Sequence, residues 1–260
     1  MNRPPSGIRA ILFDLEGTLY ESGRPIPGAV QTLSALDRSG IPYRFVTNTT
    51  SRPRRVLVEE LSRMELPADP DRIFTAPRAA REFLLGKGWT RASLLVRPAV
   101  VEDLGGIEAD ERAPQAVVYG DLGEETTFAR LNTAFRHLLE GAELVTLARN
   151  RYYRGQDGLR LDQGPFTAAL EYASGKTAML VGKPSPEFFA GALASLGVPA
   201  AEAAVVGDDL EADVAGGQRV GMRGILVRTG KFREDDLARS RVRPDAVIGS
   251  VADLPDLIGP

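Results

Sequence analysis

The strongest constraint on the fold is an alternation of short apolar runs with segments of helical spacing. Residues 8–13 form a largely apolar run, typical of a central strand buried on both faces. A loop rich in glycine and proline follows, and a helical stripe then precedes a second apolar run at 42–46. The alternation returns late in the chain, with further strands expected at 178–181, 203–206, 224–227 and 246–248. This pattern predicts an α/β fold with a doubly wound, Rossmann-like parallel sheet.

The middle of the chain has strand and helix patterns of its own. Strands are expected at 94–96, 117–119 and 144–147, a helix at 128–139 and a hairpin around 155–158. The simplest organisation is a core domain made of residues 1–77 and 176–260. An inserted α/β domain at 78–175 would then split this core.

Composition narrows the chemistry that the chain can perform. It has no cysteine, which excludes disulfides, thiolate nucleophiles and cysteine-ligated metals. Its one histidine, His137, lies in a stretch of helical spacing, which argues against a His-ligated zinc or a Ser-His-Asp triad. Carboxylates, hydroxyls and lysines remain, and they suit a hard metal such as Mg²⁺. Only four of the 32 basic residues are lysines, so each lysine is a candidate for a specific role.

Charge and hydropathy exclude several classes of partner. A net charge of −3 gives no long-range attraction to nucleic acid or to an anionic membrane. The first apolar run is too short for a signal peptide and ends in Asp14. No stretch approaches the length of about 18 apolar residues that a membrane helix needs. We therefore expect a cytoplasmic protein with neither nucleic acid nor a membrane as its partner.

Polar residues follow the expected strands at the points where they end. Asp14 follows the first strand, Thr47-Asn48 the second, and Lys183 and Asp208-Asp209 follow the next two. Ligands of open parallel sheets bind beyond the carboxyl ends of the strands, so these groups should meet in one crevice. Two carboxylates there would repel each other and invite a divalent cation, while Lys183 would neutralise a further negative charge. The sequence therefore predicts a phosphate site.

The same segments resemble the motifs of a known family. Residues 14–19, Asp-Leu-Glu-Gly-Thr-Leu, resemble the first motif of haloacid dehalogenase-type phosphatases, Asp-x-Asp-Gly-Thr-Leu. Thr47, Lys183 and the segment Gly207–Asp213 resemble the second, third and fourth motifs. The inserted block is similar to the large cap of the subfamily that contains the bacterial nucleotidase NagD. The resemblance covers nearly the whole chain and implies a phosphohydrolase that acts on a small phosphorylated substrate.

The resemblance also implies how the chemistry would run. Asp14 would attack phosphorus and form a transient aspartyl-phosphate, which splits one difficult displacement into two easier ones. Mg²⁺ would be held by the carboxylates of Asp14 and Asp208 and by the backbone carbonyl of Glu16, screening the phosphoryl charge.

The other motif residues would position the phosphoryl group. Thr47 and Asn48 would hydrogen-bond its oxygens, and Lys183 would pair with them and with the nucleophile. Asp213 would orient Lys183 or the waters of the metal. Asp209 would support the metal site in the same way, or would be a solvated loop residue.

Glu16 departs from the family pattern, which has an aspartate that protonates the leaving group and then activates water. Its carboxyl lies one methylene further from the backbone, and a misplacement of about 1 Å can lower a rate by about 10²-fold. Slow turnover on generic substrates is therefore expected. Two alternatives stay open: a phosphate- or phosphoprotein-binding module that has lost turnover, and a haloacid dehalogenase, which needs a halide pocket rather than a metal.

Substrate choice is expected to reside in the insert. Arg149, Asn150 and Arg151 follow a strand and precede the hairpin, so they are candidates for a substrate loop. The arginines would recognise a second phosphate or a carboxylate, although a solvated basic loop explains them equally well. Caps of this size often mediate dimers in the resembling family, so a homodimer through the cap is a further expectation. The substrate stays open among sugar phosphates, nucleotides, pyrophosphate and phosphorylated side chains.

Overall fold

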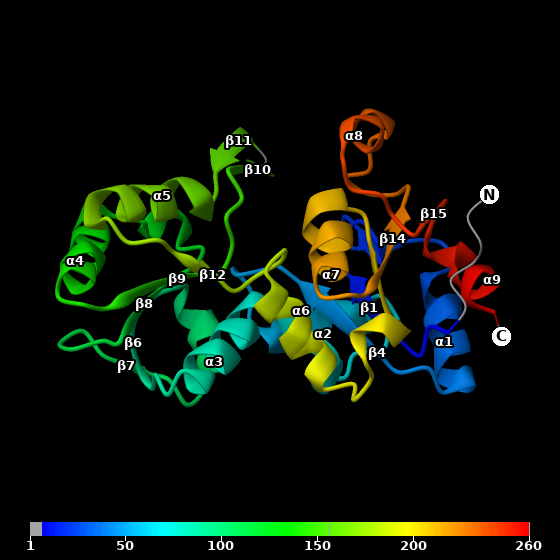
Figure 1. Cartoon of the computed structure of the whole chain (residues 1–260), viewed down its shortest axis with the longest axis horizontal. Helices are drawn as coiled ribbons and strands as arrows, with labels where there is room; N and C mark the ends of the chain where they lie inside the picture. Colours follow the sequence, from blue (N-terminus) through cyan, green and yellow to red (C-terminus); the bar gives the residue numbers. More distant parts are fainter. Residues whose placement is uncertain (1–6, 156, 260) are drawn as a thin grey trace. The chain divides into compact units, whose positions relative to one another are not determined.

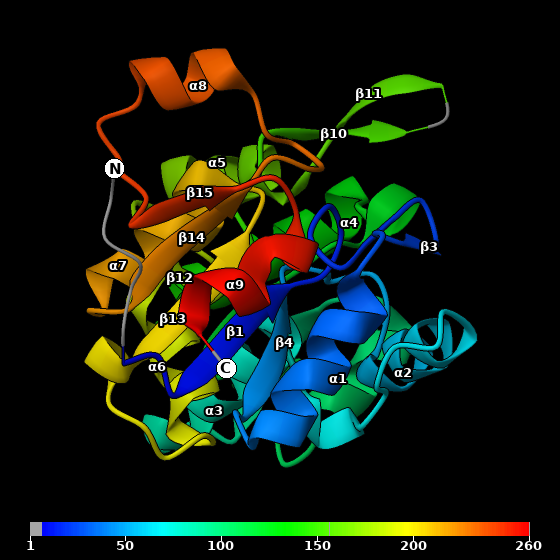
Figure 2. The same cartoon turned by 90° about the vertical axis from the view of Figure 1, so that its right-hand side faces the viewer.

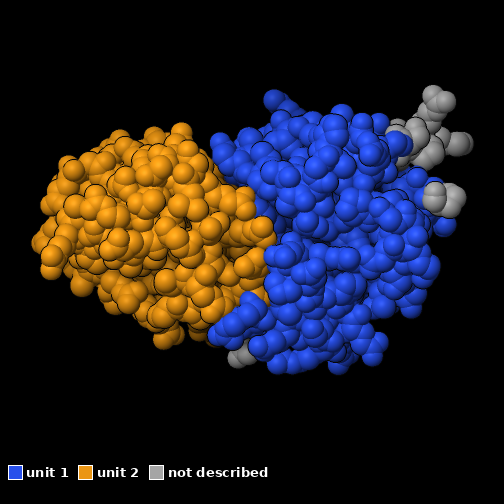
Figure 3. All heavy atoms as spheres, turned by 90° about the horizontal axis from the view of Figure 1, so that it is seen from below, with its two compact units in different colours: residues 1–47, 55–74, 183–260 blue, residues 48–54, 75–182 orange. Residues whose placement is uncertain are grey.

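The computed structural model describes residues 7–155 and 157–259 (Figure 1). The chain divides into two compact units (Figure 3). Unit 1 contains residues 1–47, 55–74 and 183–260, and unit 2 contains residues 48–54 and 75–182. Residue 156, at the tip of the expected hairpin, lies outside the described residues. Within the described part of the chain, no helix has both the length and the apolar composition needed to cross a bilayer.

Unit 1 is built on a six-stranded sheet with the order β15-β14-β13-β1-β4-β5. Its strands are β1 (Ala10–Asp14), β4 (Tyr43–Thr47), β5 (Ile73–Thr75), β13 (Ala203–Gly207), β14 (Arg223–Val227) and β15 (Ala246–Ile248). Central β1 runs parallel to both of its neighbours, β13 and β4. Every residue of β1 and β13 is buried, because helices cover both faces of the sheet at these strands. The predicted α/β fold with a parallel sheet is confirmed.

Helices pack on both faces of this sheet. They are α1 (Ala29–Ser39), α2 (Arg54–Arg63), α6 (Pro186–Ala194), α7 (Gly216–Arg219) and α9 (Leu254–Ile258), with short turns η1 (Pro70–Arg72), η4 (Ala200–Glu202), η5 (Leu210–Ala215) and η6 (Val251–Asp253). Helix α8 (Glu234–Arg239) follows β14 and buries none of its residues. Helices α1 and α9 lie on one face of the sheet (Figure 2). There Leu33 of α1 and Leu254 of α9 join the core cluster of Phe13. On the other face, Gly217 of α7 lies so close to Val205 of β13 that a Cβ at residue 217 would collide with its side chain.

A small hairpin follows β1 directly. It consists of β2 (Tyr20–Glu21) and β3 (Arg24–Pro25), which pair antiparallel. Ser22 and Gly23 form its turn with φ values of 51° and 73°. Such left-handed conformations match the twist of a tight two-residue hairpin.

Unit 2 has a second sheet, of five strands, with the order β12-β9-β8-β6-β7. Its strands are β6 (Arg91–Leu95), β7 (Glu108–Ala109), β8 (Ala116–Tyr119), β9 (Glu143–Thr146) and β12 (Met179–Leu180), and every neighbouring pair is parallel. Its helices are α3 (Ala76–Gly86), α4 (Phe128–Leu139) and α5 (Gln163–Ser174), with short turns η2 (Pro98–Leu104) and η3 (Gly123–Glu125). The antiparallel hairpin of β10 (Tyr152–Gly155) and β11 (Gly158–Leu161) lies between β9 and α5, as the sequence predicted.

One expected strand belongs to a different sheet from the one that the sequence suggested. The run at 178–181 was assigned to the core sheet, and this was wrong, because β12 pairs with β9 through Met179↔Val145 and Leu180↔Thr146. A short apolar strand has the same pattern in either sheet, so periodicity alone could not assign it.

Candidate active site

Acidic side chains gather at the carboxyl edge of the unit 1 sheet. Asp14 is the last residue of β1, and Asp208 follows β13 directly. Asp213 lies in η5, the next turn of the chain. One carboxylate oxygen from each of the three lies within 4.8 Å of the other two, and all three side chains are buried. Two of these carboxylates come from strand ends that the sequence had singled out.

A buried lysine joins two of these carboxylates. The Lys183 Nζ donates to Asp14 Oδ1 over 2.5 Å and to Asp213 Oδ1 over 2.7 Å. Lys183 is 5% exposed, so water screens these ion pairs only weakly. The ammonium therefore fixes the position of Asp14 and offsets part of the negative charge in the cluster.

Burial and mutual repulsion raise the pKa values of the carboxylates. Burial raises the pKa of Asp14, Lys183 lowers it, Asp208 raises it again, and the net change is upward. Burial raises the pKa of Asp208 to about 6, against the lowering effect of the Lys231 backbone N–H. Burial lowers the pKa of Lys183, but the two paired carboxylates outweigh it and raise that pKa above its ordinary value. The site therefore holds more negative charge than its one buried lysine neutralises.

The Asp208 carboxylate has one fixed oxygen and one without a partner. Its Oδ2 accepts the Lys231 backbone N–H over 2.7 Å. Its Oδ1 is buried and has no hydrogen-bond partner within the described residues. Gly17 and Gly230 both pack against this carboxylate, so a Cβ on either residue would collide with it. The loops are thus shaped around Asp208, and its second oxygen is left for a ligand.

These oxygens suit a divalent metal ion. Buried carboxylates are the ligands that hard cations prefer, and a cation would relieve both their repulsion and the unpaired Asp208 Oδ1. Asp213 is the least suited of the three, because Lys183 Nζ occupies its Oδ1 and the Asp209 backbone N–H donates to its Oδ2 over 3.2 Å. Asp14 and Asp208 are therefore the better pair of ligands.

Glu16 lies two residues after Asp14 in the chain, and Thr47 is the last residue of β4. Their surroundings differ. The Glu16 side chain is exposed, and its Oε1 accepts the Ser22 backbone N–H over 2.9 Å, which ties it to the β2–β3 hairpin. Thr47 ends β4, one residue beyond the pairing of Asp14 with Val46, and is 8% exposed.

The other predicted substrate residues belong to unit 2. Asn48 lies in the segment 48–54. The Arg149 guanidinium pairs with the Glu171 carboxylate at 2.7 and 3.1 Å. The Asn150 carbonyl accepts the Gly164 backbone N–H over 2.9 Å, and Arg151 is exposed. Their role in binding substrate stays a prediction.

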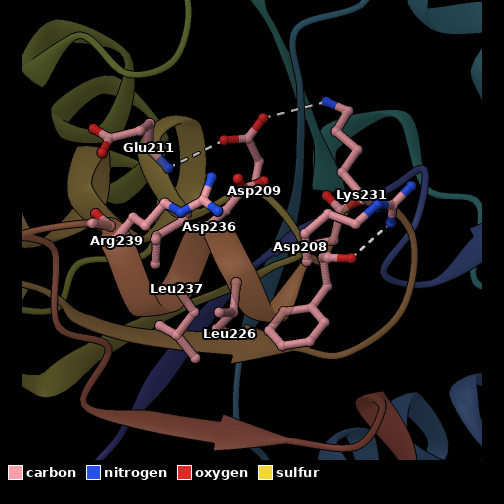
Figure 4. A pocket seen from close by; sticks show the side chains of 12 residues that line it. Asp208, Asp209, Glu211, Leu226, Lys231, Asp236, Leu237 and Arg239 are labelled. Carbon is pink, nitrogen blue, oxygen red and sulfur yellow. Dashed lines mark hydrogen bonds and ion pairs between the residues drawn. The ribbon is translucent and has the colours of Figure 1, made fainter.

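Lys231 is a site residue that the motif analysis did not select. Its Nζ lies 3.4 Å from Asp209 Oδ2, and the two side chains converge at a cavity of about 500 Å³ (Figure 4). Leu226 and Leu237 line this cavity together with Asp208 and Asp209 (Figure 4). The scarcity of lysine could have pointed to Lys231 in the sequence, because Lys231 and Lys183 are two of only four lysines.

Known families and individual known proteins both match this chain. A family described as haloacid dehalogenase-like hydrolase matches residues 11–107, and one described as HAD-hydrolase-like matches residues 180–254. The chain is 40% identical to human phospholysine phosphohistidine inorganic pyrophosphate phosphatase over 97% of its length and 95% of the relative. It is 44% identical to human haloacid dehalogenase-like hydrolase domain-containing protein 2 over 88% of its length and 87% of the relative.

Solved structures of similar fold cover both units. A 4-nitrophenylphosphatase from Thermotoga maritima superposes with a TM-score of 0.89 at 29% identity, covering 96% of this chain and 97% of that one. NagD from E. coli K-12 superposes with a TM-score of 0.87 at 25% identity, covering 95% and 98%.

Proposed function

Because the chain belongs to the haloacid dehalogenase-like hydrolase family, we propose that it is a Mg²⁺-dependent phosphatase that acts on a small phosphorylated compound through an aspartyl-phosphate intermediate. The resemblance to NagD-type phosphatases seen in the sequence is confirmed by the relatives and the fold. The observation that carries the proposal is the Lys183 bridge from Asp14 to Asp213, beside Asp208, in one buried cluster.

Asp14 is the proposed nucleophile. Its carboxylate oxygen would form a bond to phosphorus while the bond from phosphorus to the leaving-group oxygen breaks. Water would then attack phosphorus, release inorganic phosphate and regenerate the carboxylate. Attack needs the ionised carboxylate, and Lys183 favours that form against the effect of burial.

Mg²⁺ is the proposed cofactor, and when bound it would screen the phosphoryl charge from the attacking carboxylate. The carboxylates of Asp14 and Asp208 would hold it, together with the backbone carbonyl of Glu16. Asp213 has both oxygens engaged, so its proposed role is to position Lys183.

The remaining roles concern the phosphoryl oxygens and the leaving group. Thr47, Asn48 and Lys183 would hydrogen-bond the phosphoryl oxygens. The Glu16 carboxyl would give a proton to the leaving group, and the Ser22 amide would limit how far it moves. The insert at 78–175 would act as a cap, with Arg149, Asn150 and Arg151 binding the rest of the substrate and the cap forming a homodimer.

Phosphate release from a panel of phosphorylated metabolites tests this proposal. The purified full chain should release phosphate only with Mg²⁺, and Asp14→Asn should abolish release. Asp256→Asn is the matched control, because that exposed carboxylate lies on α9 beside Ser39 and Ile41, which precede β4, and not at the carboxyl ends of the strands. Peptide mapping after acid quench should find the phosphoryl group on Asp14. A chain that binds phosphorylated compounds but never releases phosphate would instead be a binding module.

A further inference from the structure

The sheet of unit 2 has a point at which its winding reverses. Its strands occur in the chain as β6, β7, β8, β9 and β12 but lie in the order β12-β9-β8-β6-β7, so the winding reverses between β6 and β8. The apolar cluster on one face draws on α3 and η2, and the cluster on the other face draws on α4 and α5. Ligands of such sheets bind beyond the carboxyl ends of the strands that flank the reversal. The end of β8 is therefore an expected binding place.

A cavity of about 160 Å³, here called the β8 cavity, lies at this strand end. Its lining combines the segment after β8, the β10–β11 hairpin and the start of α5. Three of the lining side chains are aromatic: Tyr119, Tyr153 and Phe166. The rings of Tyr119 and Phe166 have centroids 6.4 Å apart. The volume suits a chain of a few heavy atoms rather than a nucleotide.

The described side chains of the lining carry a net negative charge. They include the carboxylates of Asp121, Glu124 and Asp162 and one guanidinium, that of Arg160. The Arg160 guanidinium is already bound to the Asp157 carboxylate at 2.7 and 2.8 Å. Its charge is therefore offset by a residue outside the lining.

Two of the three carboxylates lack a cationic partner. Asp121 pairs with Arg97 at 3.0 Å. Among the side chains of residues 7–153 and 157–259, no lysine, arginine or histidine forms an ion pair with Glu124 or Asp162. Burial raises the pKa of Tyr119 to about 12, and the carboxylates of Asp121 and Asp162 add to the rise. A cation in the β8 cavity would therefore be attracted and an anion repelled.

A buried amide adds a hydrogen-bond acceptor. Gln163 lines the β8 cavity and is 4% exposed. Its Nε2 donates to Thr50 Oγ1 over 2.7 Å, while its Oε1 is buried without a partner among the residues described. Leaving such an acceptor unpaired costs free energy, which an N–H donor from a ligand would recover.

We propose that the β8 cavity binds the protonated amino group of a small alkylamine. The aromatic rings attract an ammonium through their faces, the unpaired carboxylates offset its charge, and Gln163 Oε1 accepts one of its N–H groups. The amine is either a free molecule or the amino end of the phosphorylated substrate, and the second case rests on the function proposed above.

Calorimetric titration of the full chain at pH 7 tests the cavity without any hydrolysis. Pentylamine, in EDTA and without phosphate, should bind at least about tenfold more tightly than 1-pentanol, which has the same length and no charge. Tyr153→Leu should weaken amine binding about fivefold to tenfold. Tyr152→Leu is the matched control, because Tyr152 is the neighbouring residue of the same strand and does not line the cavity.

A second pair of variants tests the charge. Asp162→Asn keeps the N-cap of α5, since asparagine caps as well as aspartate, and it should weaken amine binding about fivefold or more. Glu108→Gln removes an exposed carboxylate outside the lining and should change nothing. Equal affinity for pentylamine and pentanol, or equal losses in the two tyrosine variants, would overturn the proposal.

Hydrolysis then separates the two sources of the amine. A lower KM for 5-aminopentyl phosphate than for pentyl phosphate, lost in Tyr153→Leu, assigns the amino group to the substrate. Equal KM values with intact pentylamine binding assign the cavity to a free amine. The titration can also be run on Asp14→Asn protein, so a failure of hydrolysis would count against the proposed function alone.

Discussion

The Lys183 ammonium donates to the Asp14 carboxylate over 2.5 Å, and both groups are buried. Lys183→Met would leave the carboxylates of Asp14 and Asp213 buried without their counter-charge. Breaking one partner of a buried pair costs about 3–5 kcal/mol, so the free energy of unfolding, measured with urea, should fall by that amount. The pKa of Asp14 should also rise, because Lys183 lowers it, and the acid limb of kcat/KM should move to higher pH.

Lys176→Met is the control for this change. Its ammonium pairs with the Glu143 carboxylate at 3.0 Å on the surface of unit 2. Surface pairs contribute about 0–1 kcal/mol, so this variant should unfold almost like the wild type. If both variants lost the same free energy of unfolding, the buried ion pair of Lys183 would contribute no more to stability than the surface pair of Lys176.

Gly17 should be required for metal binding as well as for its backbone conformation. Its φ is +86°, and a Cβ there would collide with the Asp208 carboxylate. Gly23 has a similar φ of +73° with no atom near a Cβ position, so Gly23→Ala should cost only about 1–2 kcal/mol of backbone strain. Gly17→Ala should lose more stability and also weaken Mg²⁺ binding in calorimetry. Equal Mg²⁺ affinity in both variants would contradict the role assigned to Asp208.

The raised pKa of Asp208 predicts how the metal-free protein responds to pH. Burial raises this pKa from 3.8 to about 6, so the folded state holds the proton more tightly than the unfolded state. The protonated Asp208 side chain therefore stabilises the folded state. This stabilisation, roughly 3 kcal/mol, is complete below pH 3.8 and is lost as pH rises through 6. In EDTA, Tm should therefore be lower at pH 7 than at pH 5. Asp208→Asn should reduce this difference and remove the rise in Tm that Mg²⁺ causes at pH 7.

Asp209→Asn is the control for the pH response. The pKa of Asp209 is lowered, with its backbone hydrogen bonds opposing burial, so its contribution is lost only as pH falls below the ordinary carboxyl range. Asparagine can also keep the cap that Asp209 provides to η5. The Tm difference between pH 5 and pH 7 should therefore change much less than in Asp208→Asn.

The sequence predicted those parts of the site that follow from strand ends. Asp14 and Asp208 each stand directly after a fully buried strand, and parallel strands bring their carboxyl ends to one edge. Contacts made by loops had no such signal. The Lys231 amide reaches Asp208 through the left-handed turn at Gly230, and no periodicity encodes that approach.

The organisation of unit 2 could likewise be predicted from the sequence only in part. Helical spacing located residues 128–139 correctly, since α4 has those bounds. The sheet that β12 joins depends on which strand lies beside it, here β9, and an apolar run of two to four residues carries no such information. The β8 cavity likewise arises from segments that are separated in the chain and meet only in the fold.

Glu16→Asp should raise turnover of p-nitrophenyl phosphate about tenfold or more, because it places the carboxyl at the distance that the family pattern has. Glu21→Asp is the control, since that exposed residue of β2 is shortened in the same way next to the same hairpin. Unchanged or lower kcat in Glu16→Asp would mean that the glutamate, with its 2.9 Å hydrogen bond from the Ser22 amide, is already a working acid.

Arg151→Ala should raise KM for the physiological substrate about tenfold while leaving Mg²⁺ affinity unchanged, because a lost charge-assisted hydrogen bond is worth roughly 1.5–3 kcal/mol. Arg151 is exposed, whereas the Arg149 guanidinium already pairs with Glu171, so Arg151 is the cleaner test of the predicted substrate loop. Arg130→Ala, which removes an exposed arginine paired with Glu125 in the same unit, is the control. Steady-state kinetics with the best substrate of the metabolite panel, and calorimetry with Mg²⁺, give both constants. A change in Mg²⁺ affinity would place this arginine at the metal site rather than in the substrate loop.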